Sequence, residues 1–266
     1  MNTKIAPVLA TAAFARNLFA RTDCIGPDEI KQAFGLEINA DIPPIPFTED
    51  ELTRARKLGQ FLILYNRSIT MQQLHDRAKN KLGVGKLLYD TDWYSKEPFF
   101  TEETPALGWK LVGREVIPGS TSQNYLGQTE VLATYVTDQV FAGMKLPAVY
   151  KVALAEFEDS KAAIGKIVDS DWKKAAEELS ELKLNQLFRG TPAETLYGYI
   201  AYFEINHEYL LPDMYHWTAS RSSDGDLVRL GGGESDGVGV YDDDPRFSDS
   251  NLGVVFSRSV APDLVS

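Results

Sequence analysis

The feature that most constrains this fold is a long helical middle flanked by strand-like segments. Residues 120–210 show almost continuous helical spacing of apolar residues. The segments FLILY (61–65), GWKLVGREVI (108–117) and LGVVFSRS (252–259) have the length and apolar content of strands. Because strands and helices do not alternate, we predict an α+β domain with a helical insertion over about 120–210, not a βαβ sheet.

The first 46 residues have the features of a helical arm. Phe14, Leu18 and Phe19 share one face of an amphipathic helix, and GPDEIKQAFGL (26–36) has Pro and Gly near its two ends. The three prolines of DIPPIP (41–46) then impose an extended connector. Thr48 and Glu51 form a capping box that predicts the start of the helix TEDELTRARKLG (48–59). We therefore predict an arm over 1–46, packed on a domain that spans 47–266.

The opening residues also resemble a signal peptide, because Lys4 precedes a short apolar run with small residues. Pro7 and the amphipathic face that follows favour a docking helix instead. No stretch approaches the ~18 uncharged apolar residues of a membrane span. A cytoplasmic location is the expectation that these features favour.

Composition excludes several classes of function. The chain has 266 residues, 44% of them hydrophobic, which is enough for a substantial core. Its 27 basic and 38 acidic residues give a net charge of −11, which disfavours binding to nucleic acids and to anionic membranes. The single cysteine, Cys24, permits neither an intrachain disulfide nor a cysteine-cluster zinc site.

Motifs for catalysis or cofactor binding are incomplete. The glycines at 231–233 lack the Lys-Ser/Thr of a phosphate loop, and the aspartates at 242–244 are adjacent, not spaced as in an EF-hand. His75, His207 and His216 have no metal-ligand spacing. We predict no catalytic residue, no metal and no cofactor.

The most unusual segment lies between residues 222 and 251. It holds eight acids and two arginines, which gives 2 − 8 = −6 and so more than half of the net charge of the chain. A solvated, glycine-rich loop would explain this composition. Tyr, Ser, Gly, Asp and Arg are also the residues of adaptable recognition surfaces, where Tyr supplies contact area at low entropic cost.

The pattern WTASRSSDGDLVRLGGGESDGVGV (217–240), a polar stretch and then LGVVFSRS (252–259) resembles the C-terminal half of the C-type-lectin fold in formylglycine-generating-enzyme-like domains. Within that fold, the tail is similar to the variable proteins of diversity-generating retroelements, and the resemblance extends from about residue 47. In that family a reverse transcriptase substitutes bases opposite template adenines and so diversifies the tail. The implied variable region is about 226–251.

This resemblance implies a partition of the tail. The scaffold residues would be Trp217, Ser222, Asp224, Gly225, Gly237, Val240, Leu252, Gly253 and Ser257 to Ser259. The ligand-binding, diversified residues would be Asp226, Arg229, Gly231, Gly233, Gly239, Tyr241, Asp242, Asp243, Asp244, Arg246, Phe247, Ser248, Asp249 and Ser250. Alternation along a strand makes such a partition feasible, because one face varies while the other stays packed.

The chain departs from the related enzymes and, at one position, from the adenine rule. Glu234 is not reachable from an asparagine codon by substitution at adenines, and Val255 replaces an arginine of the related enzymes. Their two active-site cysteines are absent, so formylglycine synthesis is not implied.

The expected function is therefore non-enzymatic binding of a ligand by a diversified surface. The ligand is expected to be a protein, and the acidic surplus favours one with a basic surface. An enzyme of the formylglycine-generating or oxidoreductase class, a hydrolase using the acidic cluster, and an assembly protein built on the helical middle are the alternatives. The oligomeric state stays open.

Overall fold

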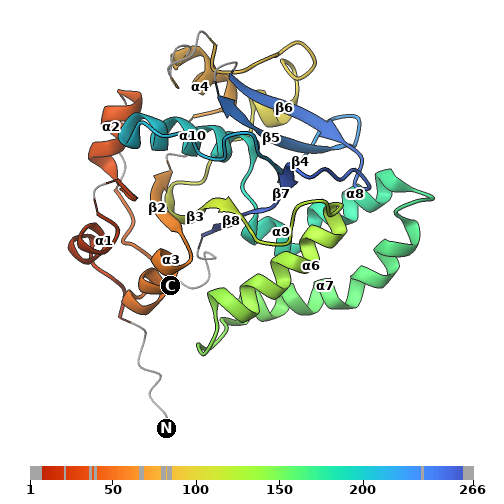
Figure 1. Ribbon diagram of the computed structural model, residues 1–266, viewed down its shortest axis with the longest axis horizontal. Coiled ribbons are helices and arrows are strands. Elements are labelled where there is room, and N and C mark those ends of the chain that lie inside the picture. The colour runs from red at the N-terminus through yellow and green to blue at the C-terminus, as the bar shows by residue number, and fades with distance from the viewer. Residues whose placement is uncertain are drawn as a thin grey trace.

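The computed structural model describes residues 8–20, 22–35, 38, 41–65, 69–78, 82, 86–234 and 237–259. Over these residues the chain is an α+β protein with two four-stranded sheets and helices packed around them (Figure 1). The strands come from both ends of the chain and the middle is helical, as the spacing of apolar residues predicts. No described helix is long and apolar enough to cross a membrane.

The first sheet has the order β1-β2-β3-β8, with β1 (Cys24–Ile25), β2 (Gln60–Tyr65), β3 (Gly108–Val116) and β8 (Val255–Arg258). Every residue of β2 is buried, because Phe61 and Ile63 pack into one core cluster and Leu62 packs into another. A strand that is buried on both faces has a continuous apolar sequence. The run FLILY forms a strand, as predicted, for this reason.

The second sheet has the order β6-β5-β4-β7, with β4 (Tyr215–Arg221), β5 (Leu227–Glu234), β6 (Gly237–Asp243) and β7 (Leu252–Gly253). Strands β4, β5 and β6 form an antiparallel meander, and β7 returns parallel to β4. Strands β4 to β7 therefore form one sheet, in which β4 and β5 are the two central strands.

The C-terminal segment joins the two sheets. Chain direction continues from β7 in the second sheet through Val254 into β8 in the first. The backbone N–H of Val254 donates to the hydroxyl of Ser120 (3.1 Å), and its carbonyl accepts from the N–H of Ile117 (2.8 Å). Val254 and Phe256 are fully buried. LGVVFSRS is therefore buried, as predicted, but it forms two short strands in different sheets and not one closing strand.

The N-terminal segment is more than a covering arm. Helices α1 (Ala12–Phe19) and α2 (Pro27–Phe34) flank β1, which pairs in parallel with β2 and so extends the first sheet. After the proline-rich connector, α3 (Glu49–Lys57) begins with the predicted capping box of Thr48 and Glu51. The segment is integrated because its strand supplies backbone hydrogen bonds to the sheet edge.

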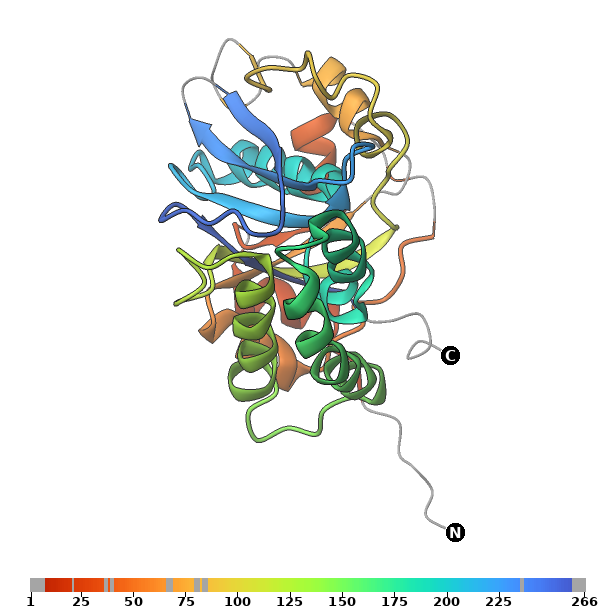
Figure 2. The ribbon, with the colours of Figure 1, turned by 90° about the vertical axis from the view of Figure 1, so that its right-hand side faces the viewer.

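Helices from the middle of the chain occupy two sides of the molecule. Residues of α6 (Tyr125–Tyr135), α7 (Ala148–Ile167), α8 (Trp172–Glu181) and α9 (Lys183–Phe188) build one core cluster with β7 and β8. By contrast, α10 (Pro192–Asn206) lies beside α2 and packs into the core cluster that contains Phe61 and Ile63 of β2 (Figures 1 and 2). All residues from Pro192 to Tyr202 are buried, so α10 is a central helix. The regular elements between residues 120 and 210 are therefore all helices, as predicted, but they are divided between two layers.

Two short helices complete the described structure: α4 (Met71–Arg77) and α5 (Pro98–Thr101). Between them, residues 86–97 form an irregular segment rich in aromatic residues, part of which lies along the outer edge of β6. In this segment Leu88 forms an isolated bridge with Val238, and the indole N–H of Trp93 donates to the carbonyl of Val240 (3.2 Å). The free edge of β6 is therefore covered, which protects it from pairing with another chain.

Candidate functional site

Alternation along β5 and β6 divides the tail into two faces. Val228, Leu230, Val238 and Val240 point into the core cluster that contains α10, and each is at most 3% exposed. The residues between them point to the opposite face of the sheet. In the register of the sheet, Arg229 lies opposite Trp217 on one side and opposite Tyr241 on the other. This second face carries Arg229, Gly239, Tyr241 and Asp243, whereas the predicted binding residue Asp242, which lies opposite Val228 in the register, alternates to the first face.

Arg229 is the centre of a cluster on that face, which we call the arginine cluster: Tyr215, Arg229, Tyr241, Asp243 and Phe247. The guanidinium carbon lies 4.7 Å from the centre of the Tyr241 ring, 4.9 Å from that of Phe247 and 5.2 Å from that of Tyr215. Its Nε donates to Asp243 Oδ2 at 2.6 Å. The cation is thus held by cation–π contacts and one ion pair. The Tyr241 side chain remains exposed (37%).

The loop between β6 and β7 extends this face. Its carbonyl groups are tied to the start of α6, because Ser122 N–H donates to Asp249 O (2.8 Å) and Tyr125 N–H donates to Pro245 O (3.1 Å). Arg246 donates through Nε and Nη2 to the two carboxylate oxygens of Asp244, each at 2.9 Å. The hydrogen bond from Arg246 lowers the pKa of Asp244. The loop is therefore anchored through its backbone, while most of its side chains face solvent.

The adjacent aspartates diverge from one another. Asp243 is neutralised by Arg229 and Asp244 by Arg246, whereas Asp226 and Asp242 form no ion pair with any described residue. Burial, reinforced by neighbouring acids, raises the pKa of Asp226, and burial also raises the pKa of Asp242. The cluster is not a set of converging carboxylates, and the surface keeps unpaired negative charge.

Most of the predicted binding residues reach solvent. Those classed as exposed are Tyr241, Arg246, Ser248, Asp249 and Ser250. Those that are half-buried are Asp226, Arg229, Asp242, Asp243, Asp244 and Phe247. The predicted scaffold residues Trp217, Leu252 and Val240 are buried, whereas Asp224, also assigned to the scaffold, is exposed in the turn before β5. Gly233 lies in β5, but its surroundings fall outside the part of the chain that is described.

The expectation of exposure is wrong for Gly231 and Gly239, which are buried. A Cβ atom at Gly231 would lie 2.1 Å from the carbonyl oxygen of Met214 and 2.5 Å from the Cα of Tyr215. Both contacts are with backbone, so Gly231 is needed for the close approach of β4 and β5. At Gly239 the corresponding contacts are the side chains of Tyr241 (2.7 Å) and Tyr215 (3.1 Å). Because side chains can rotate away, Gly239 should tolerate substitution better than Gly231 does.

Sequence reasoning missed two aromatic residues beside the predicted binding residues, one on the second face and one at the edge of β6. Tyr215 lies on β4 two residues before Trp217, and its ring packs edge-on against Tyr241 at 5.6 Å. Period-two alternation counted back from Trp217 would have identified it. Trp93 is 38% exposed beside β6; nothing local in the sequence places it there.

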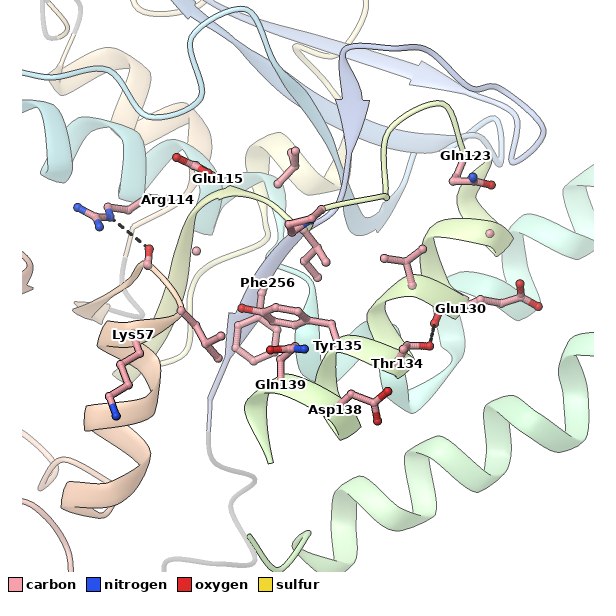
Figure 3. A pocket seen from close by; sticks show the side chains of 18 residues that line it. Lys57, Arg114, Glu115, Gln123, Glu130, Thr134, Tyr135, Asp138, Gln139 and Phe256 are labelled. Carbon is pink, nitrogen blue, oxygen red and sulfur yellow. Dashed lines mark hydrogen bonds between the residues drawn. The ribbon is translucent and has the colours of Figure 1, made fainter. Parts of the chain in front are cut away.

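A large cavity lies elsewhere. It is a groove of about 980 Å³ between the end of α3, the end of β3 and one side of α6 (Figure 3). None of the predicted binding residues lines it. The predicted binding residues therefore lie outside this groove.

Metal-binding and redox chemistry have little to build on in the described residues. No three of their His, Cys, Asp and Glu side chains gather as a metal site would require. Cys24 is buried, and burial raises the pKa of its thiol to about 11. A thiol with such a pKa is a poor nucleophile at neutral pH.

Comparison with known proteins adds no relative to this picture. No protein-family model, no curated protein and no solved structure matches the chain.

Proposed function

We propose that this chain is a non-enzymatic binding protein whose C-terminal tail, on a C-type-lectin-like scaffold, is a recognition surface diversified by a retroelement. The observation that carries the proposal is the alternation along β5 and β6. Arg229, Tyr241 and Asp243 share the solvent side of the sheet, while Val228 and Val240 fill the core behind them. Substitution on one face then leaves the packing of the other face intact.

The anchoring of the loop supports the same function. The hydrogen bonds that hold residues 244–251 against α6 come from backbone groups at Pro245 and Asp249. Backbone hydrogen bonds persist when a side chain changes, so the loop can keep its path through many sequences. A surface of this kind separates stability from recognition, as the antigen-binding loops of antibodies do.

The chemistry of the face favours a protein ligand with a basic surface. Tyr241 and Phe247 offer aromatic contact area, which is typical of the strongest points in protein interfaces. Asp249 is exposed in the loop beside this face, and Asp226, Asp242, Asp243 and Asp244 lie near one another at the end of the β5–β6 pair. Such a surface complements cationic groups.

Sequencing the DNA that flanks the gene tests this proposal. We expect a nearby repeat that almost matches the codons for residues 226–251 and differs from them at adenines, together with a reverse transcriptase gene. Sister copies should differ at the exposed and half-buried positions and keep Gly231. Differences spread evenly along the chain, with no repeat and no reverse transcriptase, would refute the retroelement origin.

A display experiment tests the surface itself. One library randomises the exposed residues Tyr241, Arg246 and Ser248, and a matched library randomises Val228, Leu230 and Val238 with the same codons. We expect most members of the first library to resist protease, because the changes lie in solvent, and few of the second. Equal survival of the two libraries would contradict the division into binding face and core.

A further inference from the structure

The groove in Figure 3 is built by two irregularities of the backbone. Val112 pairs with Ser257 and Val116 with Val255, so three residues of β3 oppose the single residue Phe256 of β8. Opposite this bulge, α6 continues into one π-helical turn, Val136–Val140. Bulges and π-turns both occur often at functional sites, because each redirects side chains out of a regular ladder.

The floor of the groove is apolar and aromatic. Tyr135 and Phe256 form an edge-to-face pair with ring centres 5.4 Å apart, and they lie side by side in the middle of the groove (Figure 3). Leu58, Val116 and Val131 surround them. The volume of about 980 Å³ is at the upper end of the range for ligand sites. The groove runs from Lys57 at one end to Gln123 at the other (Figure 3), which suits an elongated occupant.

The rim carries more acidic than basic side chains, three against two, and only longer-range interactions join Glu115 to Arg114 and Glu130 to Lys161. Glu115, Glu130 and Asp138 are exposed and make no ion pair with any described residue. Of the two basic residues in the lining, Arg114 is directed to Asp23 (3.5 Å) and to the carbonyl of Gly59 (3.2 Å). Lys57 lies at the opposite end of the groove from Glu130 and Asp138 (Figure 3).

We propose that this groove binds a basic amphipathic segment of a partner protein, independently of the tail. An apolar side chain of that segment would pack on Tyr135 and Phe256, and lysine or arginine side chains would pair with Glu130 and Asp138. Such a segment matches both properties of the groove, its apolar floor and its acidic rim. A wholly apolar segment would leave the acids of the rim without a partner, and an acidic segment would be repelled by them.

Fluorescence anisotropy with labelled octapeptides tests the proposal on the full chain. The probes are GKLKFKLG, its acidic counterpart GELEFELG and its polar counterpart GKSKSKSG. We expect GKLKFKLG to bind and the other two to bind at least about tenfold more weakly, since each lacks one of the two contributions. Equal binding of the acidic peptide, or of the polar one, would overturn the proposal.

Paired variants separate the groove from the general negative charge of the chain. Glu130→Gln with Asp138→Asn removes two charges from the rim, and we expect about a tenfold loss of affinity for GKLKFKLG. Asp159→Asn with Glu181→Gln makes the same charge change at exposed positions outside the groove, and should cost less than about twofold. Equal losses in the two variants would mean that only net charge attracts the peptide.

A second pair tests the apolar floor. Val131→Ser changes a groove residue, whereas Val152→Ser changes a valine of α7 that is 54% exposed and lies outside the groove. We expect only Val131→Ser to weaken binding, with thermal melts confirming that both variants fold. Unchanged affinity in a folded Val131→Ser variant would exclude this floor as the binding surface.

Discussion

Gly231→Ala should destabilise the protein severely, although it adds one methyl group. The new Cβ would lie 2.1 Å from Met214 O and 2.5 Å from the Cα of Tyr215. Non-bonded carbon atoms are most stable about 3.5–4.0 Å apart, so both contacts are far too short. Relief requires β4 and β5 to separate, which strains the hydrogen bond from Gly232 N–H to Met214 O (3.0 Å). Overpacking costs about 1–3 kcal/mol and the hydrogen bond about 1 kcal/mol. We therefore expect a loss of about 2–4 kcal/mol.

Urea unfolding followed by tryptophan fluorescence measures this loss, since Trp217 lies on the adjacent strand, opposite Arg229. Gly239→Ala is the matched control: the same methyl group meets the side chains of Tyr241 and Tyr215, which can rotate away. The control should lose about 1 kcal/mol or less. If Gly231→Ala loses no more than Gly239→Ala, the close approach of the two strands does not restrict that position, and Gly231 returns to the set of variable positions.

Three further predictions concern charge. Removing Arg229 and Asp243 singly and together in a double-mutant cycle should give a coupling of about 1 kcal/mol, because the pair is only partly exposed; additive losses would show that the ion pair contributes nothing to stability. Burial lowers the pKa of His216 from 6.5 to about 4. As pH decreases, His216 is therefore protonated in the unfolded chain before it is protonated in the folded chain. The free energy of unfolding should fall between about pH 6.5 and pH 4, by up to roughly 3 kcal/mol. His216→Gln should lack that part of the acid sensitivity in urea unfolding, and an unchanged pH profile would contradict the assignment. The pKa values of Asp226 and Asp242 are raised, so the contribution of each carboxyl group to stability is greatest below its unfolded pKa and is lost as pH rises through the folded pKa. Asp226→Asn and Asp242→Asn should therefore be at least as stable as the parent chain in urea unfolding at pH 7. A marked loss for either variant would show that the fold needs that negative charge.

Local features were predicted well because their causes lie within a few residues. The capping box of Thr48 and Glu51 depends on hydrogen bonds across three residues. The strand at Gln60–Tyr65 follows from a short apolar run of strand length. The exposure of Tyr241 beside buried Val240 follows from period-two alternation. The C-type-lectin-like identity of the fold and the diversified function stay predictions, because they rest on resemblance.

The errors have a common cause in contacts between distant segments. Gly231 belongs to the glycine-rich stretch that composition assigns to a loop, yet its neighbours are Met214 and Tyr215, on the preceding strand. Likewise, α10 shares the helical spacing of the helices before it but packs on the opposite side, against α2. Spacing along one element predicts which face is apolar and says nothing about which partner covers it.

The sequence by itself determined the α+β class, the helical middle, the acidic tail and the alternation of its strands, because composition and periodicity act residue by residue. Tertiary structure alone decided which tail positions have room to vary, how Arg229 collects three aromatic rings, and where α3, β3 and α6 meet to form a groove. The physical reason is that steric room and burial are properties of pairs of segments. They are set when distant parts of the chain pack together.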